Sequence, residues 1–348
     1  MNDRFRALVY GTALAVLLGW VLYIGRDILV PIVFSVMVMY VILGSARLLA
    51  RLPVIGPALP MQLHYGLSAL VMLGALLLLG WLTMDSVDQL VAQAPHYQSQ
   101  LVALVQRGAS FFGVESEPSW DTIRHAVLEH VNPQRLVGSM LLSVTSLLTG
   151  LSVVGLYVVF LMVERRHFDA KVDGLTRDPE QGARIRRIVA DINGRIGTYL
   201  ALKTLLSVLL GFASWIVLAA MGVELAPFWA LLIGLLNYVP YIGSVLGVLL
   251  PVVFALLQFG DLKTTLVLAG ALSVVQFLNG NLLDPYLMGN SLNLSPFVIL
   301  VCLTVWTALW GVPGAFLAVP VTASIVMVLA EFQGSRPIAV LLSQKGEV

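Results

Sequence analysis

The polar side chains best suited to binding a solute lie in the last third of the chain, inside or next to apolar sequence. Asn237, Gln276, Asn279 and Asn281 carry amides, and Asp284 adds a carboxylate. Gln276 and Asn279 are three residues apart, which places them on one face of a helix. Amides donate and accept hydrogen bonds without the desolvation cost of a charge, so this set favours a small polar solute.

Two interruptions of apolar sequence accompany these residues. The first reads Asn-Tyr-Val-Pro-Tyr-Ile-Gly at 237–243, and the second reads Gly-Val-Pro-Gly at 311–314. Broken backbone at membrane depth is tolerated only where it is buried in protein or lines a wet cavity, and paired breaks are typical of transport sites. The predicted transport path comprises Asn237, Tyr238, Pro240, Tyr241, Gly243, Gln276, Asn279, Asn281, Asp284, Gly311, Pro313 and Gly314.

A packing role for the same segments stays open. Both contain small residues, among them Gly243, Gly247, Gly314 and Ala318, and small residues let membrane helices approach closely. Asp284 has a further alternative as an ion-coupling residue, because acids within membrane spans are usually functional. Pro285 follows it, so the acid is equally explained as the end of a span.

No catalytic constellation appears in the sequence. It has no His-Glu-x-x-His motif, no Gly-x-Ser-x-Gly motif and no Gly-rich phosphate loop of the ATPase type. The one cysteine, Cys302, lies in an apolar run. We therefore expect no enzyme activity, no cofactor and no metal site. The net charge of +1, without a basic and aromatic patch, gives no reason to expect nucleic-acid binding.

The composition predicts an integral membrane protein. Of 348 residues, 59% are hydrophobic and 11% are charged, whereas soluble domains carry about 25% charged residues. We expect an all-α, polytopic fold with about 7–8 transmembrane segments, including the two broken stretches, which we expect to form hairpins or half-helices. The N-terminal segment to Ile24 is expected to be an uncleaved first span, joined to the second in a tight hairpin. The other predicted spans are 28–44, 66–84, 140–163, 200–221 and 266–283.

Shifts in composition predict the domain organisation. The extramembrane insertion is acidic, and the segment before residue 200 is basic and amphipathic, with Ile185, Ile188, Ile192 and Ile196 on one face of a surface helix. The Lys/Arg bias places both termini and the basic segment in the cytoplasm. The predicted regions are 1–84 with three spans, 85–139 as an extracytoplasmic helical insertion, 140–163 as the fourth span, 164–199 as the cytoplasmic basic segment, 200–331 as the transport region and 332–348 as a cytoplasmic tail.

Three motifs resemble one known family. Leu-Asn-Tyr-Val-Pro-Tyr-Ile-Gly at 236–243, Asn-Leu-Leu-Asp-Pro-Tyr-Leu-Met-Gly at 281–289 and Trp-Gly-Val-Pro-Gly-Ala-Phe-Leu-Ala-Val-Pro-Val at 310–321 are similar to hallmark segments of the autoinducer-2 exporter (AI-2E) family of permeases. The chain departs from that pattern at Ser244, where proline is usual, and at Asp284, where glutamate is frequent. The resemblance implies a homo-oligomeric, multi-pass transporter of the bacterial inner membrane.

The leading hypothesis is secondary export of a small polar organic molecule of the quorum-signal type, such as autoinducer-2, by a protein partnered by the lipid bilayer and its solute. The first alternative is a Na⁺(Li⁺)/H⁺ antiporter that uses Asp284, which is the other activity that the resemblance implies. The second alternative is a membrane scaffold or regulator that transports nothing and binds partners through the acidic insertion and the surface helix.

Overall fold

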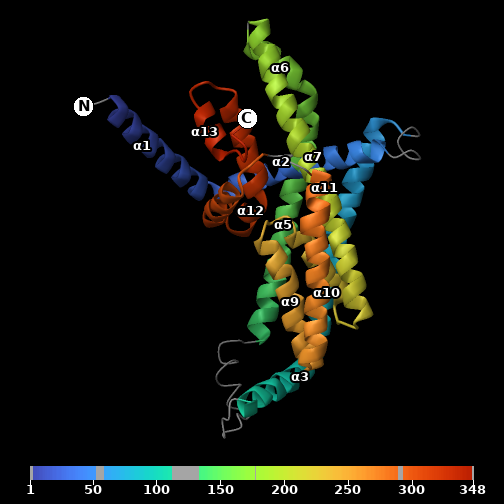
Figure 1. The fold of residues 1–348 in the computed structure, drawn as a ribbon. Coiled ribbons are helices and arrows are strands. Elements are labelled where there is room, and N and C mark those ends of the chain that lie inside the picture. Colours follow the sequence, from blue (N-terminus) through green and yellow to red (C-terminus); the bar gives the residue numbers. More distant parts are fainter. Residues whose placement is uncertain (1–2, 52–58, 112–132, 177, 289–292, 347–348) are drawn as a thin grey trace. The chain divides into compact units, whose positions relative to one another are not determined.

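A computed structural model describes residues 3–51, 59–111, 133–176, 178–288 and 293–346. In these ranges the chain is helical, apart from connections and one isolated bridge between Leu294 and Ser343 (Figure 1). The elements are α1 (Asp3–Ile24), α2 (Arg26–Ala50), α3 (Met61–Phe111), α5 (Pro133–Glu164), the 3₁₀ turn η2 (Arg165–His167), α6 (Phe168–Leu175), α7 (Pro179–Ala220), α8 (Ala226–Leu236), α9 (Ile242–Phe259), α10 (Leu262–Leu278), the π-helical turn η3 (Asn279–Leu283), α11 (Asp284–Met288), α12 (Pro296–Ala330) and α13 (Arg336–Leu342).

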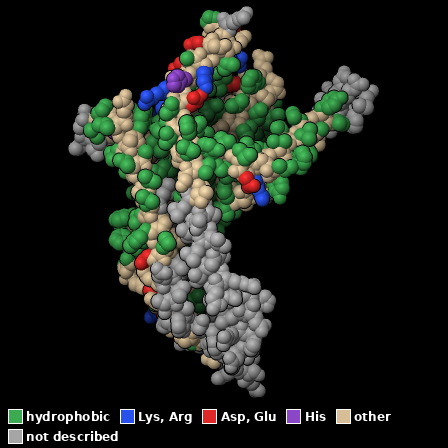
Figure 2. Space-filling view, turned by 180° about the vertical axis from the view of Figure 1, so that it is seen from behind, with side chains coloured by type: hydrophobic (Ala, Val, Ile, Leu, Met, Phe, Trp, Pro, Cys, Tyr) green, Lys and Arg blue, Asp and Glu red, His purple; other side chains and the backbone are tan. Residues whose placement is uncertain are grey.

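Membrane-length apolar helices dominate the described residues. By length and composition, six stretches there could cross a bilayer, and large apolar side chains on them face outward, for example Leu70 (66% exposed), Val208 (62%) and Phe277 (61%). Apolar surface on this scale would be unstable in water and is expected where lipid covers it. Figure 2 shows hydrophobic side chains over much of the described surface and charged side chains gathered near α6. The predicted all-α, polytopic membrane fold is confirmed. The candidate spans are Arg26–Ala50, Met61–Ser86, Pro179–Ala220, Ile242–Phe259, Leu262–Met288 and Pro296–Ala330.

The chain divides into two compact units, and α3 and α7 contribute to both. Unit 1 comprises Met1–Ser68, Gly150–Leu202 and Asn290–Val348, and unit 2 comprises Ala69–Thr149 and Lys203–Gly289. In unit 1, α2 packs on α7 at Gly44 and Gly197, where an added Cβ on Gly44 would lie 2.4 Å from the Gly197 carbonyl oxygen. Beside this contact the Tyr40 hydroxyl donates to the Asn193 side chain at 2.6 Å.

The core of unit 2 is an apolar cluster shared by α7, α8, α9 and α10. Figure 1 shows α9 and α10 running side by side, and the α9–α10 and α8–α9 pairs are in direct contact. The connection to α10 is a tight one, in which Gly260 (φ 60°) ends α9 and the Asp261 carboxylate accepts hydrogen bonds from the backbone of Lys263 and Thr264. A hydrogen bond from the Thr264 hydroxyl, followed by these backbone hydrogen bonds, lowers the pKa of Asp261. The buried cluster is Leu210, Leu218, Val223, Leu225, Ala226, Ala230, Ile233, Phe254, Ala255, Leu268 and Leu272.

Two expectations about these helices were wrong, and a third helix is longer than the span predicted in it. The first two helices form a bend rather than a tight hairpin, because the Gly25 amide donates to Val21 and the Leu29 amide to the Gly25 carbonyl, both at 2.8 Å. The third predicted span, 66–84, falls within the candidate span Met61–Ser86, and its helix continues beyond the span to Phe111. The helix after α9 does not end before Asp284 but continues to Met288. The insertion predicted at 85–139 lies partly in 112–132, outside the described residues.

Candidate functional site

The first broken stretch folds as a helical hairpin. α8 has 11 residues and α9 has 18, which corresponds to about 16 Å and about 27 Å of helix. The start of α8 and the end of α9 lie together. The Glu224 backbone amide donates to the Gln258 side-chain oxygen, and the Gln258 side-chain amide donates to the Gly222 carbonyl, both at 2.9 Å. The hairpin therefore starts and finishes at the same end, and α8 is too short to cross a bilayer alone.

The turn of this hairpin combines a left-handed backbone with a close approach. Pro240 has no amide to continue the helix, and Tyr241 takes φ 61°, a region that residues other than glycine rarely occupy. Gly243, the second residue of α9, lies so close to the end of α8 that an added Cβ would lie 1.9 Å from the Leu236 carbonyl oxygen. Only glycine fits at this position, so the sequence of the break is explained by its geometry.

A row of buried polar side chains runs beneath the turn, from α7 through the break to η3. The Asn237 amide donates to the Ser207 hydroxyl at 3.1 Å, and the Asn279 amide donates to the Asn237 side-chain oxygen at 3.5 Å. Ser207, Asn237 and Asn279 are 7%, 6% and 3% exposed. Burying three polar side chains among apolar helices is costly unless they hydrogen-bond one another, as these do.

A π-helical turn positions the last member of this row and the nearby acid. Pro285 has no amide hydrogen to donate to the carbonyl four residues back, and its ring would clash with that carbonyl in a regular α-helix. The helix therefore widens to a π-helical turn over Asn279–Leu283. The Asp284 amide then bonds the Asn279 carbonyl, five residues back. Residues five apart lie on the same face of a π-helical turn, so Asn279 and Asp284 share one face. Single π-helical turns within α-helices occur frequently at functional sites.

Asp284 forms an ion pair with a lysine of α7. The Lys203 ammonium lies 3.2 Å from Asp284 Oδ2, with 9% of the lysine side chain and 28% of the aspartate side chain exposed. The pair is electrically neutral as a whole. One buried oxygen on each of two residues, Asp284 Oδ1 and Asn279 Oδ1, has no hydrogen-bond donor among the described residues. These two oxygens can accept hydrogen bonds from a solute.

The remaining predicted residues of unit 2 separate into two groups. Tyr238 and Gln276 bond other helices, since the Tyr238 hydroxyl lies 2.6 Å from the Thr204 hydroxyl of α7 and the Gln276 amide donates to the Ser244 carbonyl of α9 at 3.4 Å. Tyr241 is 51% exposed, and the exposed Asn281 bonds only the Phe277 carbonyl of its own helix. The structure therefore joins Asn237 to Asn279 directly and ties Asn237, Tyr238 and Asp284 to neighbouring residues of α7. Gln276 lies against the first turn of α9 instead. Pro240 and Gly243 shape the turn, and the side chains of Tyr241 and Asn281 face outward.

The second break belongs to unit 1 and has the same construction. Gly311 takes φ 64° and ψ −143° inside α12, and an added Cβ on Gly314 would lie 1.9 Å from the Trp306 carbonyl oxygen. The Trp306 indole donates to the Thr322 hydroxyl at 3.1 Å although the two residues are 16 apart, a spacing of about 24 Å in a straight helix. The helix therefore turns back at Gly311, beside Pro313, as predicted for a hairpin.

A separate polar contact joins the extension of α3 to the loop before α8, away from the buried row. The Tyr97 hydroxyl donates to the Glu224 carboxylate. Burial, followed by this hydrogen bond and the charge of Glu224, raises the pKa of Tyr97. Among the described residues, no group of three or more His, Cys, Asp or Glu side chains is placed to hold a metal ion, at this contact or elsewhere.

Sequence reasoning missed the contribution of α7. Lys203, Thr204 and Ser207 all face the site, and none of them is among the site residues predicted from the sequence. A signal was available, because Lys203 and Ser207 are four residues apart in the apolar half of α7 and so share one helix face. A lysine inside a predicted span calls for a partner, and Asp284 is that partner.

Several membrane-length helices, two hairpins broken at proline and glycine, and buried amides in an apolar interior define a multi-pass membrane transporter. The model of the AI-2E family transporter matches residues 12–334, and the chain belongs to this family.

Named relatives agree with this class. The AI-2 transport protein TqsA of Escherichia coli K12 is 31% identical over 282 residues, which cover 80% of this chain and 79% of the relative. A putative transport protein of Borreliella burgdorferi is 31% identical over 262 residues, covering 74% and 70% of the two chains. The putative transport protein YhhT of E. coli K12 is 36% identical over 226 residues, covering 61% and 63%.

Proposed function

We propose that this transporter moves a small, uncharged, polar organic solute out of the cell by secondary transport, along a path that includes the buried row of unit 2. The observation that carries the proposal is the pair of buried acceptors next to the broken hairpin, Asn279 Oδ1 on η3 and Asp284 Oδ1 at the start of α11. A hydroxylated solute offers the donors that these oxygens lack, and the neutral Lys203–Asp284 pair adds no net charge that would favour an ion.

An autoinducer-2-type signal is the solute we propose, because it is small, uncharged and rich in hydroxyl groups. The relative TqsA is named an AI-2 transport protein, which supports this choice for a chain 31% identical to it. We further propose a homo-oligomer in the bacterial inner membrane with both termini in the cytoplasm. Gly311, Pro313 and Gly314 are proposed as a second part of the path, and the domain boundaries inferred from composition remain proposals.

The proposal is tested by flux of labelled autoinducer-2 in proteoliposomes. Asn279→Ala removes one hydrogen-bonding side chain from the row and is expected to lower flux about 3- to 10-fold, the effect of one or two lost hydrogen bonds. Asn281→Ala, two residues along the same turn, is the matched control because Asn281 is exposed and bonds only its own helix. Equal flux in the wild-type protein and the Asn279 variant, at equal reconstitution, would contradict the proposed path.

The ion pair supports a second candidate function, cation/proton antiport through Asp284. In that case Asp284→Asn abolishes cation-dependent proton flux, measured with a pH-sensitive dye inside the proteoliposomes. If the asparagine variant keeps full proton flux, the antiport mechanism is wrong. That result has no bearing on the proposal of solute export, which the Asn279 variant tests.

A further inference from the structure

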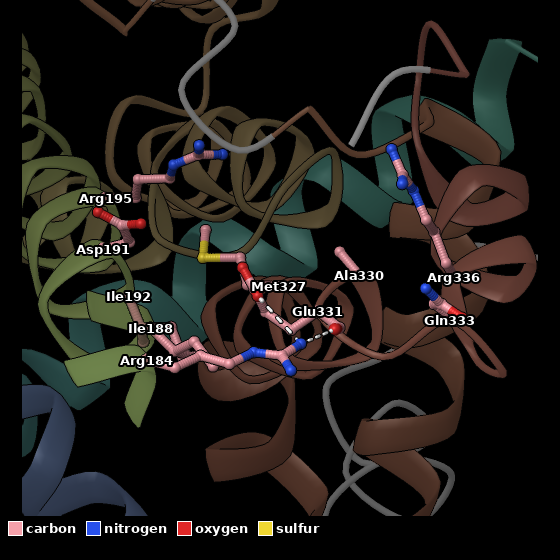
Figure 3. A pocket seen from close by; sticks show the side chains of 10 residues that line it. All are labelled: Arg184, Ile188, Asp191, Ile192, Arg195, Met327, Ala330, Glu331, Gln333 and Arg336. Atoms are coloured by element: carbon pink, nitrogen blue, oxygen red, sulfur yellow. Dashed lines mark hydrogen bonds and ion pairs between the residues drawn. The ribbon is translucent and has the colours of Figure 1, made fainter. Parts of the chain in front are cut away.

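A charged hollow lies in unit 1, built from none of the residues of the proposed path. It has a volume of about 450 Å³ and lies between the first half of α7 and the end of α12, with the start of α13 closing one side (Figure 3). This volume falls within the range of small-molecule sites. Three arginines and two acids line it, so its formal charge is positive.

The arginines of the hollow are unequally neutralised. Arg184 donates to the Glu331 carbonyl and lies 3.8 Å from the Glu331 carboxylate, so its charge is already compensated. Arg195 and Arg336 form no ion pair with a described residue, and Figure 3 shows them on opposite sides of the hollow. Asp191, one turn before Arg195, is the remaining acid. Arg195 and Arg336 are opposed by Asp191 alone. The part of the hollow away from the Arg184–Glu331 pair therefore has an excess positive charge.

The rest of the lining is apolar and lies at the end of a membrane span. Ile188 and Ile192 of α7 and Met327 of α12 face the hollow, and α12 is a candidate span that ends at Ala330. Next to it, α13 leaves Leu341 80% exposed. Exposed apolar residues on a short helix beside arginines are typical of a segment at the headgroup level of a bilayer.

We propose that this hollow binds the headgroup of an anionic glycerophospholipid, with Arg195 and Arg336 holding its phosphate and the isoleucines contacting its glycerol and upper acyl chain. Guanidinium groups suit phosphate because they present several donors in a fixed plane. A soluble phosphate ester shares the charge but gains nothing from the apolar lining. That lining and the position at the end of α12 therefore favour the lipid.

Native mass spectrometry of the full-length protein in detergent micelles tests the proposal, with phosphatidylglycerol and phosphatidylcholine as lipid probes and glycerol 3-phosphate as the soluble probe. The wild-type protein is expected to retain phosphatidylglycerol in preference to phosphatidylcholine. Arg195→Gln with Arg336→Gln is expected to lower this preference by about fivefold for each arginine. Asp191→Asn is expected to raise it, because that change removes the carboxylate facing the phosphate.

The matched control is Arg166→Gln with Arg187→Gln, which removes the same charge from exposed positions on η2 and α7 that do not line the hollow. An unchanged lipid preference in the control supports a localised site. Equal losses in the two double variants, or arginine-dependent binding of glycerol 3-phosphate equal to that of the lipid, would overturn the proposal. All substituted positions are exposed, and size-exclusion chromatography verifies that the variants remain folded.

Discussion

At the scale of single residues, the Lys203–Asp284 pair is the most sensitive feature of the proposed site. The Lys203 side chain is buried and the Asp284 side chain is 28% exposed, and each charge compensates the other. Removing one member of a buried pair leaves a charge without a partner, which costs far more than replacing both with neutral side chains. The pair therefore behaves as one unit, whatever solute passes beside it.

Substitution of Asp284 by Asn is expected to destabilise unit 2 by about 2–4 kcal/mol, because the buried Lys203 ammonium loses its counter-charge. The double variant Lys203→Met with Asp284→Asn is expected to regain most of this loss. Thermal unfolding of the purified protein, followed by tryptophan fluorescence, measures both changes. Additive effects of the two single substitutions Lys203→Met and Asp284→Asn would show that the pair contributes nothing as a pair.

At the scale of elements, the two broken hairpins use the same device. In each, a glycine just after the turn lies against a carbonyl near the end of the preceding helix, Gly243 against Leu236 and Gly314 against Trp306. A methyl group at either position would overlap the oxygen, and backbone cannot move aside as a flexible side chain can. The glycines therefore fix how closely each helix turns back.

Gly243→Ala is expected to lower the stability of the α8–α9 hairpin by about 1–3 kcal/mol or more, because the new methyl group overpacks against backbone. Gly270→Ala in α10 is the matched control, since nothing lies within 4 Å of its added Cβ. At that helical position the change is expected to be neutral or stabilising by about 0.4–1 kcal/mol. Thermal unfolding distinguishes the two, and similar behaviour of both variants would contradict the close approach at Gly243.

At the scale of the whole molecule, we expect the orientation in the membrane to follow from charge. The tail carries Lys345 and the extension of α3 carries Asp85, and the Lys/Arg-rich side is expected to face the cytoplasm. The exposed Gln89 on that extension should then face outward.

Cysteine labelling checks this orientation in a Cys302→Ser background. Gln89→Cys is expected to react with a membrane-impermeant maleimide in spheroplasts, which expose the outer face of the inner membrane. Lys345→Cys is expected to react only after permeabilisation. Labelling of both positions in intact spheroplasts would show that the tail and the α3 extension lie on the same side.

The sequence by itself determined the class of this protein and the place of its breaks. Long apolar runs cannot be stable in water, and a proline within three residues of a glycine, as at Pro240 and Gly243 or Gly311 and Pro313, favours a break in a helix, so these features follow from local chemistry. The same local reasoning gathered Asn237, Asn279 and Asp284 as candidates.

The tertiary structure decided which of these residues meet. Contacts of α7 with the end of α8 and with α11 join positions 30 and 81 residues apart, and no periodicity within one segment encodes them. The fold supplied Lys203 and Ser207, turned Asn281 outward and carried the helix past Asp284 through a π-helical turn. A partner for a buried charge is set by packing between helices, which the sequence specifies only through the whole fold.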